Sequence, residues 1–189
     1  MPTPWSDAIR AHRRDLRDAI LDAAAALVEE RGVTDVAMSH VAERSGITRA
    51  TLYKYFPDVR TILNAWHERQ VAANLAELIA ACDAAQTPRD RLAGMLDAYA
   101  KMVHEQHSSE LVALLHHSEH AIRGYERLEK LLRATISDGV RDGSFRRDVP
   151  PAELAMFCIS ALAAANRVAS MAAVRRLARI TLAAIEAQP

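Results

Sequence analysis

Residues 46–58, GITRATLYKYFPD, contain a short polar segment between two residues that end helices. Gly46 can adopt the left-handed conformation that closes a preceding helix. Pro57 ends the segment itself, because proline cannot donate a helical hydrogen bond and disfavours helical dihedrals in its predecessor. Thr48 is placed to act as an N-cap. This stretch therefore predicts a short helix that starts after Thr48 and stops before Pro57.

The two faces of this helix differ in chemistry. Leu52 and Phe56 are four residues apart, so they share one face and can anchor the helix on a core that includes Leu27 and Val41. The remaining positions carry hydroxyl and cationic groups, which suit base edges and phosphate oxygens in a DNA groove. These positions are Thr48, Arg49, Thr51, Tyr53, Lys54 and Tyr55.

The residues before this helix predict two more. Apolar residues recur at helical spacing from Asp15 until Gly32, and a short helix is expected over residues 39–45 with Val41 and Ala42 pointing inward. A short helix, a glycine turn and a second short helix form the outline of a helix-turn-helix, whose second helix enters the major groove.

The rest of the chain also reads as helix, with no strand pattern. Asp58 is expected to cap a fourth helix that reaches about Ala85, and Gly143 to end a helix carrying Leu128–Val140, before which the chain changes direction at residues 122–125. We therefore predict an all-α fold with an N-terminal three-helix helix-turn-helix domain and a larger helical body. The expected parts are a flexible tail at 1–12, a helix-turn-helix domain at 13–57 and the body at 58–189, which ends in helices at about 152–165 and 170–187.

Composition limits the classes of partner. The chain has 189 residues with 24 basic and 24 acidic side chains, so a nucleic acid has to be bound by a local patch and not by global charge. Cys82 and Cys158 lack metal-site spacing, which favours free thiols in a reducing compartment. Neither a signal peptide nor a membrane-spanning run is visible. These features predict a soluble, cytoplasmic protein without a membrane partner or cofactor.

The stretch HVAERSGITRATLYKYFPDVRTIL (40–63) resembles the DNA-binding signature of TetR-family transcriptional regulators. The resemblance covers residues 13 to 63, and GVRDGSFRRDVPP (139–151) is similar to the segment before the family's last two helices. It implies base or groove contacts for Thr48, Arg49 and Thr51, phosphate or groove contacts for Tyr53, Lys54 and Tyr55, and a phosphate contact for Ser39.

Two positions depart from the family pattern. Val59 stands where the family has a phosphate-binding lysine, and Arg60 is the candidate replacement. Val36 and Ala37 stand where hydroxyl residues cap the second helix, so Ser39 is expected to cap a shortened helix instead.

The N-terminal residues are basic. Arg10, Arg13, Arg14 and Arg17, with His12, predict either a flexible arm that adds salt-sensitive DNA contacts or a solvated helix start balanced by nearby aspartates.

The resemblance implies a ligand cavity in the body and a dimer interface made by the last two helices. The alternatives are that the cavity residues are ordinary core and that both helices are buried in a monomer. The candidate cavity residues are Trp66, Met95, Tyr99, Met102, Val103, Leu111, Leu115 and Phe157. The candidate interface residues are Leu154, Ile159, Leu162, Met171, Val174 and Leu177.

The histidines at residues 104, 107, 116, 117 and 120 could lie on the surface, line the cavity or bind a metal, and no third ligand completes a metal motif. We predict a ligand-responsive DNA-binding regulator, not an enzyme: a repressor that binds a palindromic operator as a homodimer and is released by a small-molecule effector. The alternatives are an all-α metal- or histidine-dependent enzyme and a helical interaction module without DNA binding.

Overall fold

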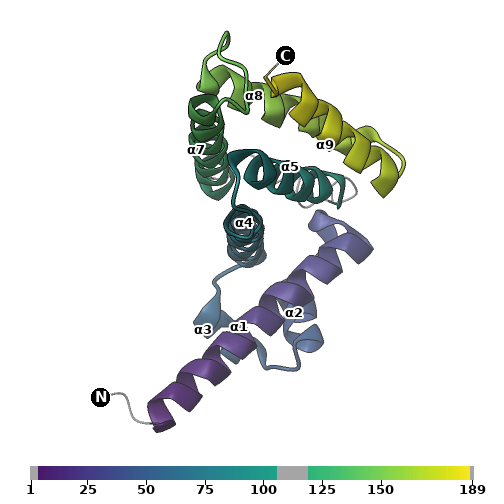
Figure 1. Cartoon of the computed structure of the whole chain (residues 1–189). Coiled ribbons are helices and arrows are strands. Elements are labelled where there is room, and N and C mark those ends of the chain that lie inside the picture. Colours follow the sequence, from purple (N-terminus) through teal and green to yellow (C-terminus); the bar gives the residue numbers. More distant parts are fainter. Residues whose placement is uncertain (1–3, 106–118, 188–189) are drawn as a thin grey trace. The chain divides into compact units, whose positions relative to one another are not determined.

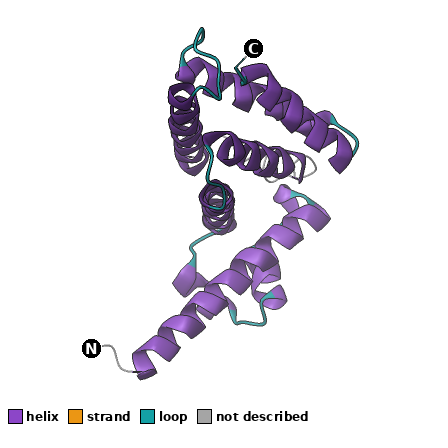
Figure 2. Ribbon diagram, in the orientation of Figure 1, coloured by secondary structure: helices purple, strands orange, loops and turns teal. Residues whose placement is uncertain are grey.

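The computed structural model of the protein describes residues 4–105 and 119–187, and this part of the chain is helical (Figures 1 and 2). The extended pairing in it is one isolated bridge between Phe145 and Glu186. The predicted all-α fold is confirmed. Among the helices in these two ranges, none is both long enough and apolar enough to cross a membrane.

The described residues form two compact units, and the division falls after Gln70. The first unit contains α1 (Pro4–Arg31), the short 3-10 helix η1 (Val33–Asp35), α2 (Met38–Arg44), α3 (Arg49–Tyr55) and the first part of α4 (Val59–Asp83). It is longer than the expected 13–57, because Ile62, Leu63 and Trp66 of α4 pack into its core.

Helix α1 starts earlier than expected. Residues 4–12 are helical and not the predicted tail, since α1 begins at Pro4. Proline is tolerated in the first turn of a helix, where its missing N–H has no intrahelical partner to lose. Arg10 donates to Asp7 at 2.5 Å, an (i, i+3) pair that supports this first part of the helix.

The core of the first unit joins all four helices. Its fully buried side chains come from α1, α2, α3 and α4, and aliphatic residues dominate it. Because α2 and α3 have only seven residues each, they depend on this packing and not on helix propensity for their stability. The most deeply buried members are Ile20, Leu21, Ala24, Val41, Leu52 and Ile62.

The second unit contains the rest of α4 with α5 (Pro88–Glu105), α7 (Glu119–Asp142), α8 (Pro151–Leu162), the 3-10 helix η3 (Ala163–Arg167) and α9 (Met171–Ile185). Helix α5 packs against α7, α8 and α9, so it is the centre of this unit. The completely buried side chains are Leu92, Met95, Leu96, Ala100, Leu132, Ile136, Phe145, Ala155, Cys158, Leu162, Ala165 and Ile185.

Helix α7 is continuous, so the expected change of direction at residues 122–125 is wrong. Gly124 belongs to the helix and lies against α4, where an added Cβ would be 2.7 Å from Cγ1 of Val71. A glycine that resembles a helix breaker in the sequence therefore marks a close approach of two helices.

Candidate nucleic-acid interface

The orientation of α3 is set by its apolar face. Leu52 is completely buried and Phe56 is 4% exposed, so these two side chains hold the helix on the core of the first unit. Arg49, Tyr53 and Lys54 are exposed, and Tyr53 is 56% exposed. The polar side chains of α3 are therefore accessible to a ligand in solvent.

The turn between α2 and α3 has the geometry expected of Gly46. Its φ of 69° is the left-handed conformation, which costs glycine little. The N–H of Ile47 donates to the carbonyl of Ala42 at 3.0 Å, and the N–H of Gly46 donates to Glu43 at 3.1 Å. These bonds satisfy the last carbonyls of α2 and direct the chain into α3.

The start of α3 is capped by Thr48, as predicted. Its Oγ1 accepts from the N–H of Thr51 at 3.1 Å and lies 2.9 Å from the Thr51 hydroxyl. The cap holds the exposed first turn of the recognition helix, where Arg49 lies, in helical geometry.

An ion pair fixes α2 to α1. Both terminal nitrogens of Arg44 donate to the Glu30 carboxylate, at 2.9 and 2.6 Å. The hydrogen bond from Arg44 lowers the pKa of Glu30. A two-point contact of this kind constrains orientation as well as distance, so it helps to hold the helix-turn-helix against the long first helix.

Helix α4 follows α3 in the chain and begins with Asp58 as its cap. The N–H of Thr61 donates to Asp58 Oδ1 at 2.7 Å, and this bond lowers the pKa of the carboxyl. Val59, at the position of the family's lysine, packs against the core, whereas Arg60 is exposed. Arg60 is thus available for a phosphate contact.

Three of the candidate DNA-contacting residues are less exposed than the others. Tyr55 is half-buried against the core, and Thr51 and Ser39 are half-buried. Ser39 is inside α2 and does not cap it: the cap position is Ala37, whose N–H donates to His40 Nδ1 at 3.2 Å. The candidates that are exposed are Thr48, Arg49, Tyr53, Lys54 and Arg60.

Two contacts of α1 were not foreseen from the sequence. The Arg17 guanidinium lies over the ring of Phe56, 5.5 Å from its centroid, and Arg69 of α4 pairs with Asp18 at 2.9 Å and with Asp22. The aspartates are four residues apart on one face of α1. That spacing is visible in the sequence, but the partner on α4 is not.

The described candidate cavity residues come from both units. Trp66 belongs to the core of the first unit, and Met95 and Tyr99 belong to the core of the second. Tyr99 is hydrogen-bonded to Tyr125, and burial is the main cause that raises its pKa. Met102 and Val103 are partly buried beside this core, and Phe157 is 44% exposed. Leu111 and Leu115 lie outside the described residues.

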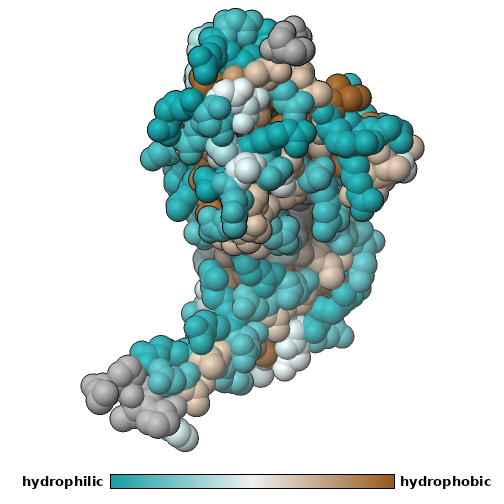
Figure 3. Space-filling model, viewed as in Figure 1, coloured by the Kyte–Doolittle hydropathy of each residue, from teal (hydrophilic) through white to brown (hydrophobic). Residues whose placement is uncertain are grey.

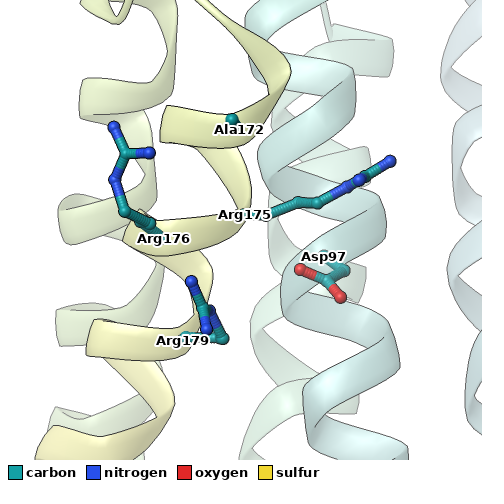
Figure 4. Close-up of a pocket in the computed structure, with 5 residues that line it drawn as sticks. All are labelled: Asp97, Ala172, Arg175, Arg176 and Arg179. Carbon is teal, nitrogen blue, oxygen red and sulfur yellow. The ribbon is translucent and has the colours of Figure 1, made fainter.

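The second unit has a hollow elsewhere, on the flank of α9 beside α5 (Figure 4). Its volume is about 330 Å³, and none of the candidate cavity residues lines it. Arg175 extends from α9 on the side where Asp97 of α5 lies, and Arg176 points to the other side of the helix. The lining residues are Asp97, Ala172, Arg175, Arg176 and Arg179.

The candidate interface residues mostly face the core of their own chain. Leu154, Leu162 and Val174 are buried there, and Ile159, Met171 and Leu177 are partly buried against it. Other apolar side chains of the same helices point outward: Met156 is 62% exposed and Phe157 44% exposed on α8, and Ile180 is 66% exposed on α9.

Of the candidate histidines, the structure describes His104 and His120, and both make hydrogen bonds. His104 Nδ1 is 3.1 Å from the carbonyl oxygen of Ala165, and His120 Nδ1 is 2.8 Å from a guanidinium nitrogen of Arg123. Within residues 4–105 and 119–187, no three metal-ligating side chains cluster. His107, His116 and His117 lie outside these ranges.

Known proteins include relatives that are similar to this chain in sequence and in fold. Residues 20–65 match the family described as "Bacterial regulatory proteins, tetR family". An HTH-type transcriptional regulator of Mycobacterium bovis is 38% identical over 66 residues, which are 35% of this chain and 35% of that protein. The chain thus aligns with about a third of that relative's length.

Solved structures share the fold over most of the chain. A TetR/AcrR-family regulator from Thermobifida fusca has a TM-score of 0.77 at 20% identity and covers 89% of this chain and 97% of its own. The regulator FadR of Bacillus subtilis, solved with stearoyl-CoA, has a TM-score of 0.71 at 15% identity, covering 88% and 98%. Residues 20–65 thus resemble the helix-turn-helix region of the TetR family of bacterial transcriptional regulators, and the chain as a whole shares the fold of these solved structures.

Proposed function

We propose that this protein is a DNA-binding transcriptional repressor that binds a palindromic operator as a homodimer and leaves it when a small-molecule effector binds. The observation that carries the proposal is the outward polar face of α3, with Arg49, Tyr53 and Lys54 exposed and the helix anchored by Leu52 and Phe56. A helix enters the major groove, which is about 12 Å wide, and donors on its exposed face can reach base edges and phosphates.

A homodimer is supported by the exposed apolar side chains of α8 and α9. Met156, Phe157 and Ile180 leave an apolar surface without cover from their own chain. Two copies that bury this surface around a two-fold axis would present two α3 helices to two half-sites of DNA. The interface we propose therefore uses these three residues in place of Leu154, Leu162 and Val174, which are already buried.

The effector step is proposed for the second unit. Helix α4 begins in the first unit, where Ile62, Leu63 and Trp66 are packed, and continues into the second. A compound that binds the second unit can shift α4 and so lower the affinity of α3 for DNA, provided that it favours the non-binding state. The stearoyl-CoA bound by FadR supports only the general idea of a small-molecule ligand on this fold. An effector that leaves operator affinity unchanged would contradict release.

The DNA contact is tested with the double variant Tyr53→Ala with Lys54→Ala. Both side chains are exposed, so the fold should be retained, and we expect loss of most affinity for the duplex directly upstream of the protein's own coding sequence. A mobility-shift titration measures the affinity, and circular dichroism checks the fold. The control is Arg127→Ala with Lys130→Ala on α7, which removes two exposed cationic side chains from the second unit.

Arg49→Ala separates two kinds of contact. If Arg49 reads a base, its loss relaxes specificity at that base pair, whereas a phosphate contact weakens binding to all sequences alike. For the variant Tyr53→Ala with Lys54→Ala, a correctly folded protein that binds the upstream duplex as tightly as the parent would refute the proposed DNA contacts of α3.

A further inference from the structure

The first turns of α1 carry an arginine stripe that the α3 surface does not include. Arg10, Arg13, Arg14 and Arg17 are spaced as i, i+3, i+4 and i+7, so they lie on one face of the helix. Between residues 5 and 19, no described side chain is buried. Hydrophilic side chains line these turns on the face shown in Figure 3. This part of α1 is therefore a charged helical projection, in which Leu16 packs against the core of the first unit.

The nearby aspartates neutralise only part of the arginine stripe. Asp7 is held by Arg10, and Asp18 and Asp22 are held by Arg69 of α4. Of the described residues, none places a carboxylate within ion-pair distance of Arg13 or Arg14. The segment's own aspartates therefore pair with Arg10 but not with Arg13 or Arg14.

The position of Arg17 relates the stripe to the recognition helix. Its guanidinium lies 5.5 Å from the ring centroid of Phe56, the residue that ends α3. Arg13 and Arg14 are one turn further toward the start of α1 on the same face. In Figure 1, the N-terminal end of α1 continues well past α3. The stripe therefore starts beside the C-terminal end of α3 and continues outward along α1.

A helix restricts which part of DNA these arginines can reach. The minor groove is about 6 Å wide, whereas a helix with its side chains is about 10–12 Å across. This segment cannot enter a minor groove in the way an extended arm does. The major groove of the half-site is taken by α3 under the proposed function. The contacts left for the stripe are backbone phosphates, which guanidinium groups bind well.

We propose that Arg13 and Arg14 bind backbone phosphates that flank the half-site read by α3. This inference rests on the proposed DNA-binding function and deepens it. The first turns of α1 span roughly 20 Å beyond the core, so they add flanking duplex to the site. Because phosphate contacts carry no sequence information, they strengthen binding to every duplex and make it more sensitive to salt.

The test is the salt dependence of the variant Arg13→Gln with Arg14→Gln. Glutamine has a helix propensity similar to that of arginine, so α1 should remain intact by circular dichroism. Fluorescence anisotropy is measured from 50 to 300 mM KCl on two labelled 30-base-pair duplexes, one from the protein's own upstream region and one unrelated. Each lost phosphate contact lowers the slope of log affinity against log salt by about 0.9.

We expect the slope to fall by about 1.8 per bound chain on both duplexes. If the lines converge near 1 M salt, the loss at 0.1 M is about 60-fold per chain. The charge-matched control is Arg127→Gln with Arg147→Gln, two exposed cations of the second unit. It should keep the parent slope.

Three results would overturn the inference. The variant could keep the parent slope, or the control could lower it equally, which would mean that only net charge matters. The third result would show that the stripe binds a membrane. In that case, anionic phosphatidylserine vesicles would shift the fluorescence of Trp5, which is 76% exposed. The variant would at the same time bind DNA as the parent does. If the parent binds neither duplex, the proposed function itself fails, which separates the two failures.

Discussion

Gly139 lies in α7 against the buried ring of Phe145, and this contact depends on the absence of a side chain. A Cβ added at Gly139 would overlap the ring, and the Phe145 side chain is completely buried, so it has no free space into which to move. The N–H of Phe145 also donates to the Gly139 carbonyl at 3.0 Å, which holds the two residues together.

Gly139→Ala should therefore destabilise the protein despite alanine's better helix propensity. We expect a loss of about 1–3 kcal/mol, the range of overpacking in a core, measured by urea unfolding. In a double-mutant cycle, Phe145→Leu should recover part of this loss. Strict additivity of the two changes would show that the overlap is not the cause.

The two cysteines should differ in reactivity. Burial raises the pKa of the Cys158 thiol to about 12, and its side chain is completely buried. Cys82 is only half-buried. Because the thiolate is the reactive form, Ellman's reagent at pH 7.5 should modify one thiol per native chain, and both thiols in denaturant. Cys82→Ser should abolish the native reaction; rapid modification that survives this change would contradict the burial of Cys158.

At the scale of elements, the caps of α3 and α4 are local and were foreseen, whereas the starts of α1 and α2 differ from expectation. Thr48, Asp58 and Thr87 cap α3, α4 and α5 through side-chain bonds to backbone N–H groups three residues on, at 3.1, 2.7 and 3.1 Å. Ser170 caps α9 in the same way at 3.3 Å. These caps are predictable because donor and acceptor are near neighbours in the chain.

The cap of α4 predicts a pH effect with a definite sign. The pKa of Asp58 is lowered from its ordinary value of 3.8, first by the bond from the Thr61 N–H. A lowered folded-state pKa means that the stabilisation is present above pH 3.8 and is lost as pH falls through the folded value. Asn at this position still caps the helix but does not titrate.

The stability gap between the parent and Asp58→Asn should thus be constant near neutral pH and shrink below about pH 4. Urea unfolding of both proteins between pH 3 and 7 measures it, and other carboxyl groups cancel because both proteins contain them. A gap that grows on acidification would contradict the assigned cap.

At the scale of the whole molecule, the homodimer can be tested at the side chains that remain exposed. Ile180→Asp places a charge on the outward face of α9, where the parent residue is 66% exposed. Burying that charge in an interface is costly, so light scattering should show a shift from twice the chain mass of 20.8 kDa to the single chain mass.

The matched control is Ile122→Asp on α7, where the isoleucine is 52% exposed but outside the proposed interface. It should leave the mass unchanged. An Ile180→Asp protein that stays dimeric, or a parent that is monomeric at micromolar concentration, would refute the proposed interface.

The sequence by itself determined the elements that depend on near neighbours. The polar face of α3, its anchors Leu52 and Phe56, and the turn at Gly46 all follow from spacing and backbone preference within about ten residues. The same local reasoning failed where a residue's role depends on a distant partner. A change of direction was expected at residues 122–125, whereas Gly124 lies inside α7 and contacts Val71 of α4.

Only the tertiary structure decided which faces are covered. Leu154 and Val174 are buried while Met156 and Ile180 are exposed, although all four are apolar residues of α8 and α9. The tertiary structure also placed Arg17 over Phe56 and paired Asp18 and Asp22 with Arg69, which leaves Arg13 and Arg14 for another partner. The physical reason is that helical periodicity follows from one segment of chain, whereas burial and ion pairing follow from segments brought together by folding.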